Sequence, residues 1–236
     1  MAKKQDVFPY TTEQLEALGK ALSIERLQPY VILSDRDPLL AIKLYEWNTA
    51  LSESFYGLLQ GLEIALRNAM HRVLGEAYGR EDWYDVCDLR PEQKDVIAKA
   101  KNRILGDKKL VTPPKVVAEM TFGFWVALSG PTYAQKLWDR TLHRAFVKKL
   151  GRKALHKRLD KIRKLRNRVA HHESILAREL KDDFSSIVET VHWICPVTAA
   201  WIKANNTFHA RYAQKPALQN SPVAEPAQGD GQTPKT

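Results

Sequence analysis

The chain has 236 residues, 44% of them hydrophobic, and a formal net charge of +10. This length and composition suffice for one domain with a full hydrophobic core. No stretch reaches the roughly 20 apolar residues of a membrane span, and the N-terminus lacks the apolar core of a secretory signal, so we expect a cytoplasmic protein without membrane contact. Cys87 and Cys195 alone are too few for a disulfide framework or a zinc site, and we expect no metal and no other cofactor.

The positive charge is concentrated in one segment. Residues 101–168 hold 19 Lys and Arg against four Asp and Glu, whereas residues 1–100 hold 12 against 16. Such a concentration attracts polyanions and favours salt-dependent association with nucleic acid. A basic helix that is merely solvated is the alternative, and the charge alone leaves both interpretations open.

Apolar residues recur at three- and four-residue spacing almost throughout, which predicts an all-α fold. The first expected helix covers residues 11–22, with Thr11 or Thr12 as its N-cap. A longer helical stretch is expected after Asp37, which caps it, with Pro38 in the first turn. Its apolar stripe continues to exit signals at Gly75 and Gly79. Whether this stretch forms one helix or two stays open.

Further helices are expected at residues 91–105, 113–129, 131–150 and 152–172, and a last one at 177–205 is expected to kink at Pro196. From about Gln214 the chain has too few large apolar residues to offset the entropy of ordering it. The predicted organisation is an N-terminal extension with a short helix (1–36), a helical domain (37–212) and a disordered tail (213–236).

The segment "KIRKLRNRVAHHES" contains the pattern R-N-x-x-x-H at Arg166, Asn167 and His171. Cleavage of RNA through its 2′-hydroxyl needs two proton transfers and stabilisation of charge on the phosphoryl oxygens. Histidine transfers protons near neutral pH, and the donors of arginine stabilise the phosphoryl oxygens. One histidine is too few for both transfers, so a second is expected from His172 or from a symmetry-related chain. The alternative is a solvated basic helix that ends in two histidines.

"LRNRVAHHE" resembles the R-x(4 to 6)-H signature of the HEPN superfamily (higher eukaryotes and prokaryotes nucleotide-binding domains). The stretches "LYEWNTALSESFYGLLQGLEIALRNAM" and "MTFGFWVALSGPTYAQKLW", with "WY" at Trp83, resemble its Abi-like (abortive infection) branch. The resemblance covers about residues 39–208. It implies a HEPN-like helical bundle, a homodimer, and a metal-independent endoribonuclease site at the dimer seam.

Carried over by residue, the resemblance implies that Arg166 binds the scissile phosphate, Asn167 orients it and His171 transfers protons. His172 and Glu173 receive supporting roles. The residues expected to bind RNA are basic ones of the same segment and one earlier arginine: Lys157, Arg158, Lys161, Arg163, Lys164, Arg168 and Arg67.

Arg67 belongs to a second, shorter "RN…H" string. It forms an i, i+4, i+8 series with Glu63 and His71, so an intrahelical pair with Glu63 is the simplest interpretation. The alternative is that Arg67 faces the same cleft as Arg166. Aromatic residues lie mainly outside the basic run, which gives little support for base stacking.

Three functions are compatible with these observations. The leading one is an endoribonuclease effector of antiphage defence, a type of abortive infection. The second is a non-catalytic protein that holds a structured non-coding RNA through its basic helices. The third is the HEPN component of a toxin-antitoxin pair with a nucleotidyltransferase.

Overall fold

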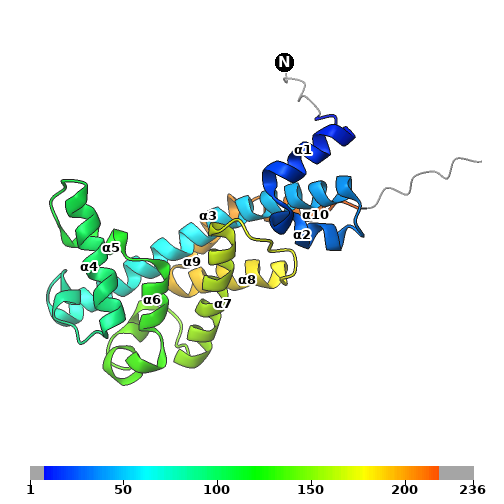
Figure 1. Ribbon diagram of the computed structural model, residues 1–236. Helices are drawn as coiled ribbons and strands as arrows, with labels where there is room; N and C mark the ends of the chain where they lie inside the picture. Colours follow the sequence, from blue (N-terminus) through cyan, green and yellow to red (C-terminus); the bar gives the residue numbers. More distant parts are fainter. Residues whose placement is uncertain (1–7, 218–236) are drawn as a thin grey trace, which may run out of the picture. The chain divides into compact units, whose positions relative to one another are not determined.

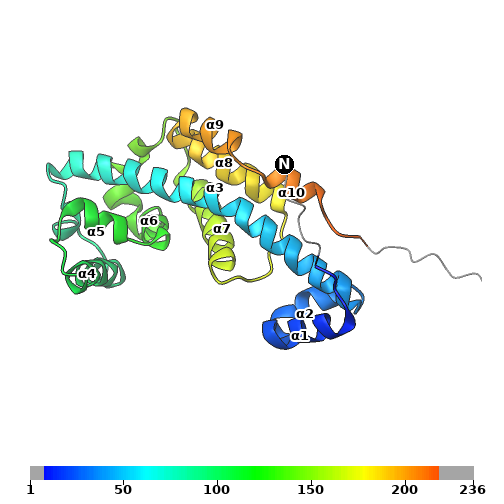
Figure 2. The same ribbon diagram turned by 90° about the horizontal axis from the view of Figure 1, so that it is seen from above.

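The computed structural model describes residues 8–217 (Figures 1 and 2), and all regular structure among them is helical, which confirms the all-α prediction. None of the helices in this described range is long and apolar enough to cross a membrane. The described part of the chain divides into two compact units, one of residues 8–44 with 216–217 and one of residues 45–215. The predicted disordered tail lies, from residue 218 on, outside the described residues.

The first unit contains α1 (Thr12–Leu22), α2 (Ile24–Leu33) and the start of α3 (Pro38–Tyr78). The hydroxyl of Thr11 accepts a hydrogen bond from Gln14 N–H, and the Gln14 side chain accepts one from Thr11 N–H, which forms a capping box. Asp37 accepts from Leu40 N–H at 2.9 Å. Both predicted N-caps, Thr11 and Asp37, are therefore confirmed.

Helix α3 is continuous from residue 38 to residue 78, which settles the question of one helix or two. It ends at Gly79, whose φ of +66° is a left-handed conformation that glycine adopts without steric cost. One face of α3 is fully buried in the core of the second unit through Leu51, Phe55, Leu58, Leu62, Leu66 and Met70.

The middle of the second unit is broken into shorter helices than expected. After a 3₁₀ turn (Trp83–Asp85) come α4 (Pro91–Gly106), α5 (Pro113–Glu119) and α6 (Phe122–Leu128). The single helix predicted for residues 113–129 is wrong, because Met120 is extended and the hydroxyl of Thr121 starts a new helix by accepting from Phe124 N–H. The break lets Phe122, Phe124 and Trp125 all be buried.

Residues 131–150 do not form the predicted amphipathic α-helix. They form a 3₁₀ turn (Pro131–Tyr133), a π-helical turn (Ala134–Trp138) and another 3₁₀ turn (Leu142–Ala145). The large side chains buried along this stretch are Tyr133, Leu137, Trp138, Leu142 and Phe146. Tertiary packing here overrides a helical pattern that the sequence alone favours.

The last helices are α7 (Arg152–Ala170), α8 (Leu180–Ile194), α9 (Pro196–Ala204) and α10 (Phe208–Ala213). The kink predicted at Pro196 is a full break, because Cys195 is extended and Pro196 begins α9. Helix α7 packs on α6 and α8, and α8 packs on α9. Helix α9 contacts α3 at Gly61, where the absence of a side chain lets Ile202 approach the backbone.

Candidate functional site

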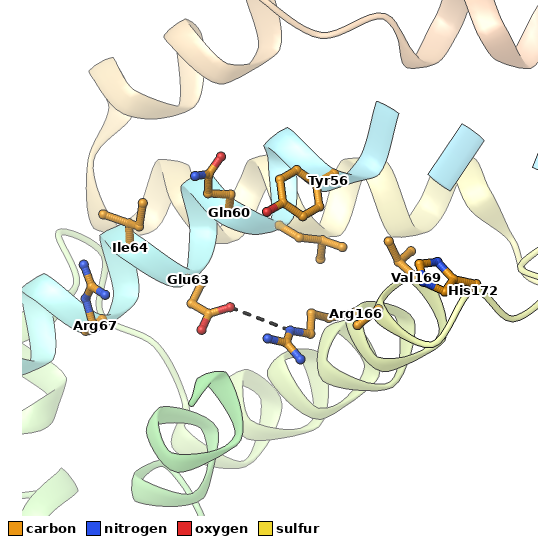
Figure 3. Close-up of a pocket in the computed structure, with 10 residues that line it drawn as sticks. Tyr56, Gln60, Glu63, Ile64, Arg67, Arg166, Val169 and His172 are labelled. Carbon is orange, nitrogen blue, oxygen red and sulfur yellow. Dashed lines mark ion pairs between the residues drawn. The ribbon is translucent and has the colours of Figure 1, made fainter. Parts of the chain in front are cut away.

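A groove of about 510 Å³ lies between α3 and the C-terminal part of α7 (Figure 3). Its α3 side carries a polar stripe at helical spacing, Tyr56, Gln60, Glu63 and Arg67, with Leu59 and Ile64. Its α7 side is formed by Arg166, Val169, Ala170 and His172. The groove therefore combines two guanidinium groups, one carboxylate and one imidazole on a largely apolar floor.

Arg166 points across this groove toward Glu63 (Figure 3). Its Nε lies 3.8 Å from Glu63 Oε2, and both side chains keep some solvent exposure, 39% and 24%. An ion pair of this length and exposure contributes about 0–1 kcal/mol. The Arg166 guanidinium can thus exchange the carboxylate for a phosphate at low cost.

Arg67 lines the same groove one turn beyond Glu63. Its Nε donates to the Asn68 side chain at 3.2 Å, and its Nη1 lies 3.5 Å from the Ala118 carbonyl. Glu63 pairs with Arg166, and no pair between Glu63 and Arg67 occurs within residues 8–217. Of the two interpretations of Arg67, the structure favours the one in which it faces the cleft.

The end of α7 decides which histidine reaches the groove. His171 is the C-cap residue, and its N–H donates to the Asn167 carbonyl at 2.9 Å. His172 has a φ of +56°; its N–H donates to Val169 O at 3.2 Å and Glu173 N–H donates to Arg168 O at 2.8 Å. These two bonds form a Schellman motif, which usually has glycine where His172 stands. The left-handed turn reverses the chain there.

The residues predicted to be catalytic are divided by this geometry. Arg166 lines the groove, whereas Asn167 and His171 are not among the lining residues. His172, to which only a supporting role was assigned, does line it. Glu173 lies beyond the turn and is exposed. The proton-transfer role of His171 stays a prediction, and His172 is the histidine that shares the groove with Arg166.

Most of the predicted RNA-binding residues lie in a second groove, between α7 and α8. This hollow of about 700 Å³ is lined by His156, Lys157, Arg158, Asp160, Lys161, Lys164 and Ser186. At 100° per residue, Lys157, Lys161 and Lys164 lie roughly 140–200° around α7 from Arg166. The basic run therefore splits between opposite sides of one helix.

Two predicted RNA-binding arginines lie in neither groove. Arg163 donates two hydrogen bonds, of 3.0 and 2.7 Å, to the carboxylate of Asp160. Burial acts to raise the pKa of Asp160, but the hydrogen bonds from Arg163 and Lys164 outweigh it and leave that pKa lowered. Arg168 donates to the Ser174 carbonyl at 3.0 Å and so supports the turn after α7.

His71, the histidine of the second "RN…H" string, has a structural partner. The indole N–H of buried Trp83 donates to His71 Nδ1 at 3.0 Å. Burial lowers the pKa of His71, and Arg67 lowers it further while Glu81 opposes them. A neutral imidazole with its proton on Nε2 is what this bond requires.

No group of three or more His, Cys, Asp or Glu side chains that could hold a metal ion occurs in the described part of the chain. The two cysteines lie apart: Cys87 is buried, and Cys195 caps the start of α9.

Sequence reasoning missed Glu63 as the partner of Arg166, and it missed Trp193, whose ring centroid lies 4.4 Å from the guanidinium carbon of Arg158. The signal for Glu63 was present, because Tyr56, Gln60, Glu63 and Arg67 repeat at helical spacing opposite the apolar stripe. Trp193 is on α8, in a different part of the sequence from the basic run, and only the packing of α8 on α7 brings them together.

A comparison with protein-family models, with curated proteins and with solved structures found no match.

Proposed function

We propose that the chain is a metal-independent endoribonuclease and that the groove between α3 and α7 is its active site. The observation that carries the proposal is the presence of Arg166, Arg67 and His172 in one groove. This set provides phosphate binding and proton transfer without requiring a metal.

The reaction begins with the 2′-oxygen, which loses its proton to a base and attacks the adjacent phosphorus. The bond between phosphorus and the 5′-oxygen breaks, and an acid gives that oxygen a proton. The products are a 2′,3′-cyclic phosphate and a 5′-hydroxyl. Arg166 stabilises the charge on the phosphoryl oxygens after the phosphate has displaced Glu63, and Arg67 supports it from α3.

The imidazole of His172 transfers one of the two protons. The second transfer falls to His171 or to the same motif of a second copy in a homodimer with the two motifs near the seam. The resemblance to the Abi-like branch supports a role in antiphage defence, in which cleavage of cellular RNA arrests an infected cell.

The test is cleavage of single-stranded RNA and transfer RNA in the presence of a chelator. Arg166→Ala is expected to lower kcat/KM by about 10²–10³-fold, since it removes the main donor to the transition state. His172→Ala should lose more activity than His171→Ala. Arg72→Ala is the control: Arg72 is an exposed arginine of α3 that pairs with Glu76 and lines neither groove, so this variant should cut like the parent.

The same variants are compared for growth arrest on induced expression, with mapping of RNA ends. A parent that leaves both RNAs intact and does not slow growth contradicts the proposal. So does an Arg166→Ala protein that cuts as fast as the parent.

A non-catalytic RNA-binding function is the second candidate, and the basic groove between α7 and α8 favours it. In that case tight, salt-sensitive binding survives His171→Ala and His172→Ala. It is lost when Lys157, Arg158, Lys161 and Lys164 are neutralised together.

A further inference from the structure

Trp193 of α8 lies beside the basic groove between α7 and α8, and two cationic side chains lie within cation–π distance of its ring. The guanidinium carbon of Arg158 is 4.4 Å from the ring centroid, and Lys148 Nζ is 5.8 Å from it. The Trp193 carbonyl accepts a hydrogen bond from Val147 N–H at 2.7 Å, which holds the segment before α7 against α8. The indole is only partly buried. A guanidinium thus lies over a partly exposed indole in a cation–π contact.

Arg158 pairs with Glu189, but several other bases near the start of α7, Lys148 among them, are not compensated by carboxylates in residues 8–217. Along residues 101–168, many bases pair with acids from other segments, such as Lys101 with Asp85 and Arg144 with Glu76. By contrast, five other bases have no carboxylate within ion-pair distance in residues 8–217: Lys148, Lys149, Arg152, Lys153 and Lys157. All five lie in the turn before α7 or in its first two turns.

The basic groove is lined mainly by α7 and, on the α8 side, by Ser186. On α7, Lys157, Lys161 and Lys164 follow i, i+4, i+7 spacing. On α8, Ser186, Glu189 and Trp193 follow i, i+3, i+7 spacing. Glu189 pairs with Arg158, which fixes that guanidinium over the indole, and Lys161 lies 3.6 Å from buried Asp183. One wall of the groove therefore carries the three α7 lysines, of which Lys161 pairs with Asp183 and Lys164 with Asp160, and Arg158 connects this wall to Trp193.

We propose that the groove between α7 and α8 binds single-stranded RNA, with the backbone along the α7 lysines and one base stacked on the Trp193 and Arg158 platform. Planar side chains on a cationic groove are how unpaired bases are held, whereas bases in a duplex are already stacked on one another. The inference rests on the proposed function in taking RNA as the ligand. It adds that the substrate is unpaired where it meets this groove.

Binding is measured by fluorescence anisotropy in the Arg166→Ala protein with chelator present, so that cleavage does not interfere. The probes are a labelled oligouridylate of about 12 nucleotides and an RNA duplex of the same length. Trp193→Ala is expected to weaken oligouridylate binding about tenfold and to leave duplex binding within twofold. Trp193→Phe keeps a ring and should recover most of the loss.

Trp201→Ala is the matched control, because Trp201 on α9 is 64% exposed and makes none of these cation contacts. Lys157→Glu should weaken both probes and reduce the salt dependence, since it reverses a phosphate contact.

The inference is overturned if Trp193→Ala binds the oligouridylate as Trp201→Ala does, or if it weakens both probes equally. It is also overturned if polyglutamate competes as well as RNA, which would make an acidic protein the occupant. Catalysis is judged separately: Trp193-dependent binding without cleavage by the parent rejects only the endoribonuclease.

Discussion

His172 combines an unfavourable backbone conformation with a position in the groove between α3 and α7. A left-handed conformation costs a residue with a side chain about 1–2 kcal/mol, and glycine avoids that cost. Backbone strain of this kind concentrates at functional sites. We therefore expect stability and activity to oppose each other at this position.

The prediction compares His172→Gly with His171→Gly. His172→Gly should raise the free energy of unfolding by about 0.5–1 kcal/mol and abolish cleavage. His171→Gly should lower stability by a similar amount, because the φ of −97° at residue 171 is ordinary for any residue. Urea unfolding of both variants checks this. Equal losses of stability would show that the turn does not strain His172.

At the same scale, the bond between Trp83 and His71 predicts acid sensitivity. Because burial lowers the pKa of His71 in the folded protein, the unfolded chain takes up a proton first as pH falls. The stabilisation is complete above the unfolded pKa of about 6.5 and is lost as pH drops below it.

Urea unfolding between about pH 7.5 and 5 measures this loss. His71→Gln keeps an acceptor for the indole N–H but cannot titrate, so its stability should fall less over the same range. An unchanged pH dependence in this variant would contradict the prediction.

Among the helices, the contact of α3 with α9 predicts opposite outcomes for two glycines. A Cβ at Gly61 would lie 2.9 Å from Cγ2 of buried Ile202, a stiff β-branched side chain, whereas a Cβ at Gly57 meets nothing within 4 Å. Gly61→Ala should cost about 1–3 kcal/mol of stability. Gly57→Ala should add up to about 1 kcal/mol.

Thermal unfolding of the two variants measures the difference. Adding Ile202→Ala to Gly61→Ala tests its cause: if the methyl clash is responsible, the two changes together cost less than the sum of their separate costs. Purely additive costs would mean that Gly61 matters for another reason.

Helix starts were predictable where one side chain or one proline determines them. Thr11, Asp37 and Pro91 stand where the sequence placed them, whereas Pro196 was expected to kink one helix and instead begins a new one. The break at Met120 and the irregular turns after Pro131 were not predictable, because they accompany the burial of large aromatic side chains such as Trp125 and Trp138. That constraint is tertiary, and periodicity in the sequence does not contain it.

For the whole molecule, the segregation of charge along the sequence does not show which bases remain unpaired in the fold. Acids of the first 100 residues pair with bases of the segment 101–168 in the fold, as Glu63 does with Arg166 and Asp85 with Lys101. The net charge predicted a polyanion partner, but which bases remain uncompensated depends on long-range pairing. This is why the sequence indicated Arg166 but did not indicate that Glu63 is its ion-pair partner in the groove.

The candidate site shows the same limit. Arg166 was identified from a short string, whereas the choice between His171 and His172 depends on where α7 ends and how the chain turns there. A periodic pattern locates the end of a helix only to within a few residues. A shift of one residue in the position of the helix end is enough to exchange which of the two imidazoles, His171 or His172, lines the groove.

Helix α7 has a buried contact or a groove on three of its sides. One side is buried through Leu155, Leu159, Ile162 and Leu165, another side faces α3, and a third faces α8. A typical surface helix has a broad solvent face on which substitutions are nearly neutral. On α7 the exposed face includes the lysines that line the basic groove. This helix should therefore tolerate less sequence drift than a typical surface helix, although more than half of its residues are polar.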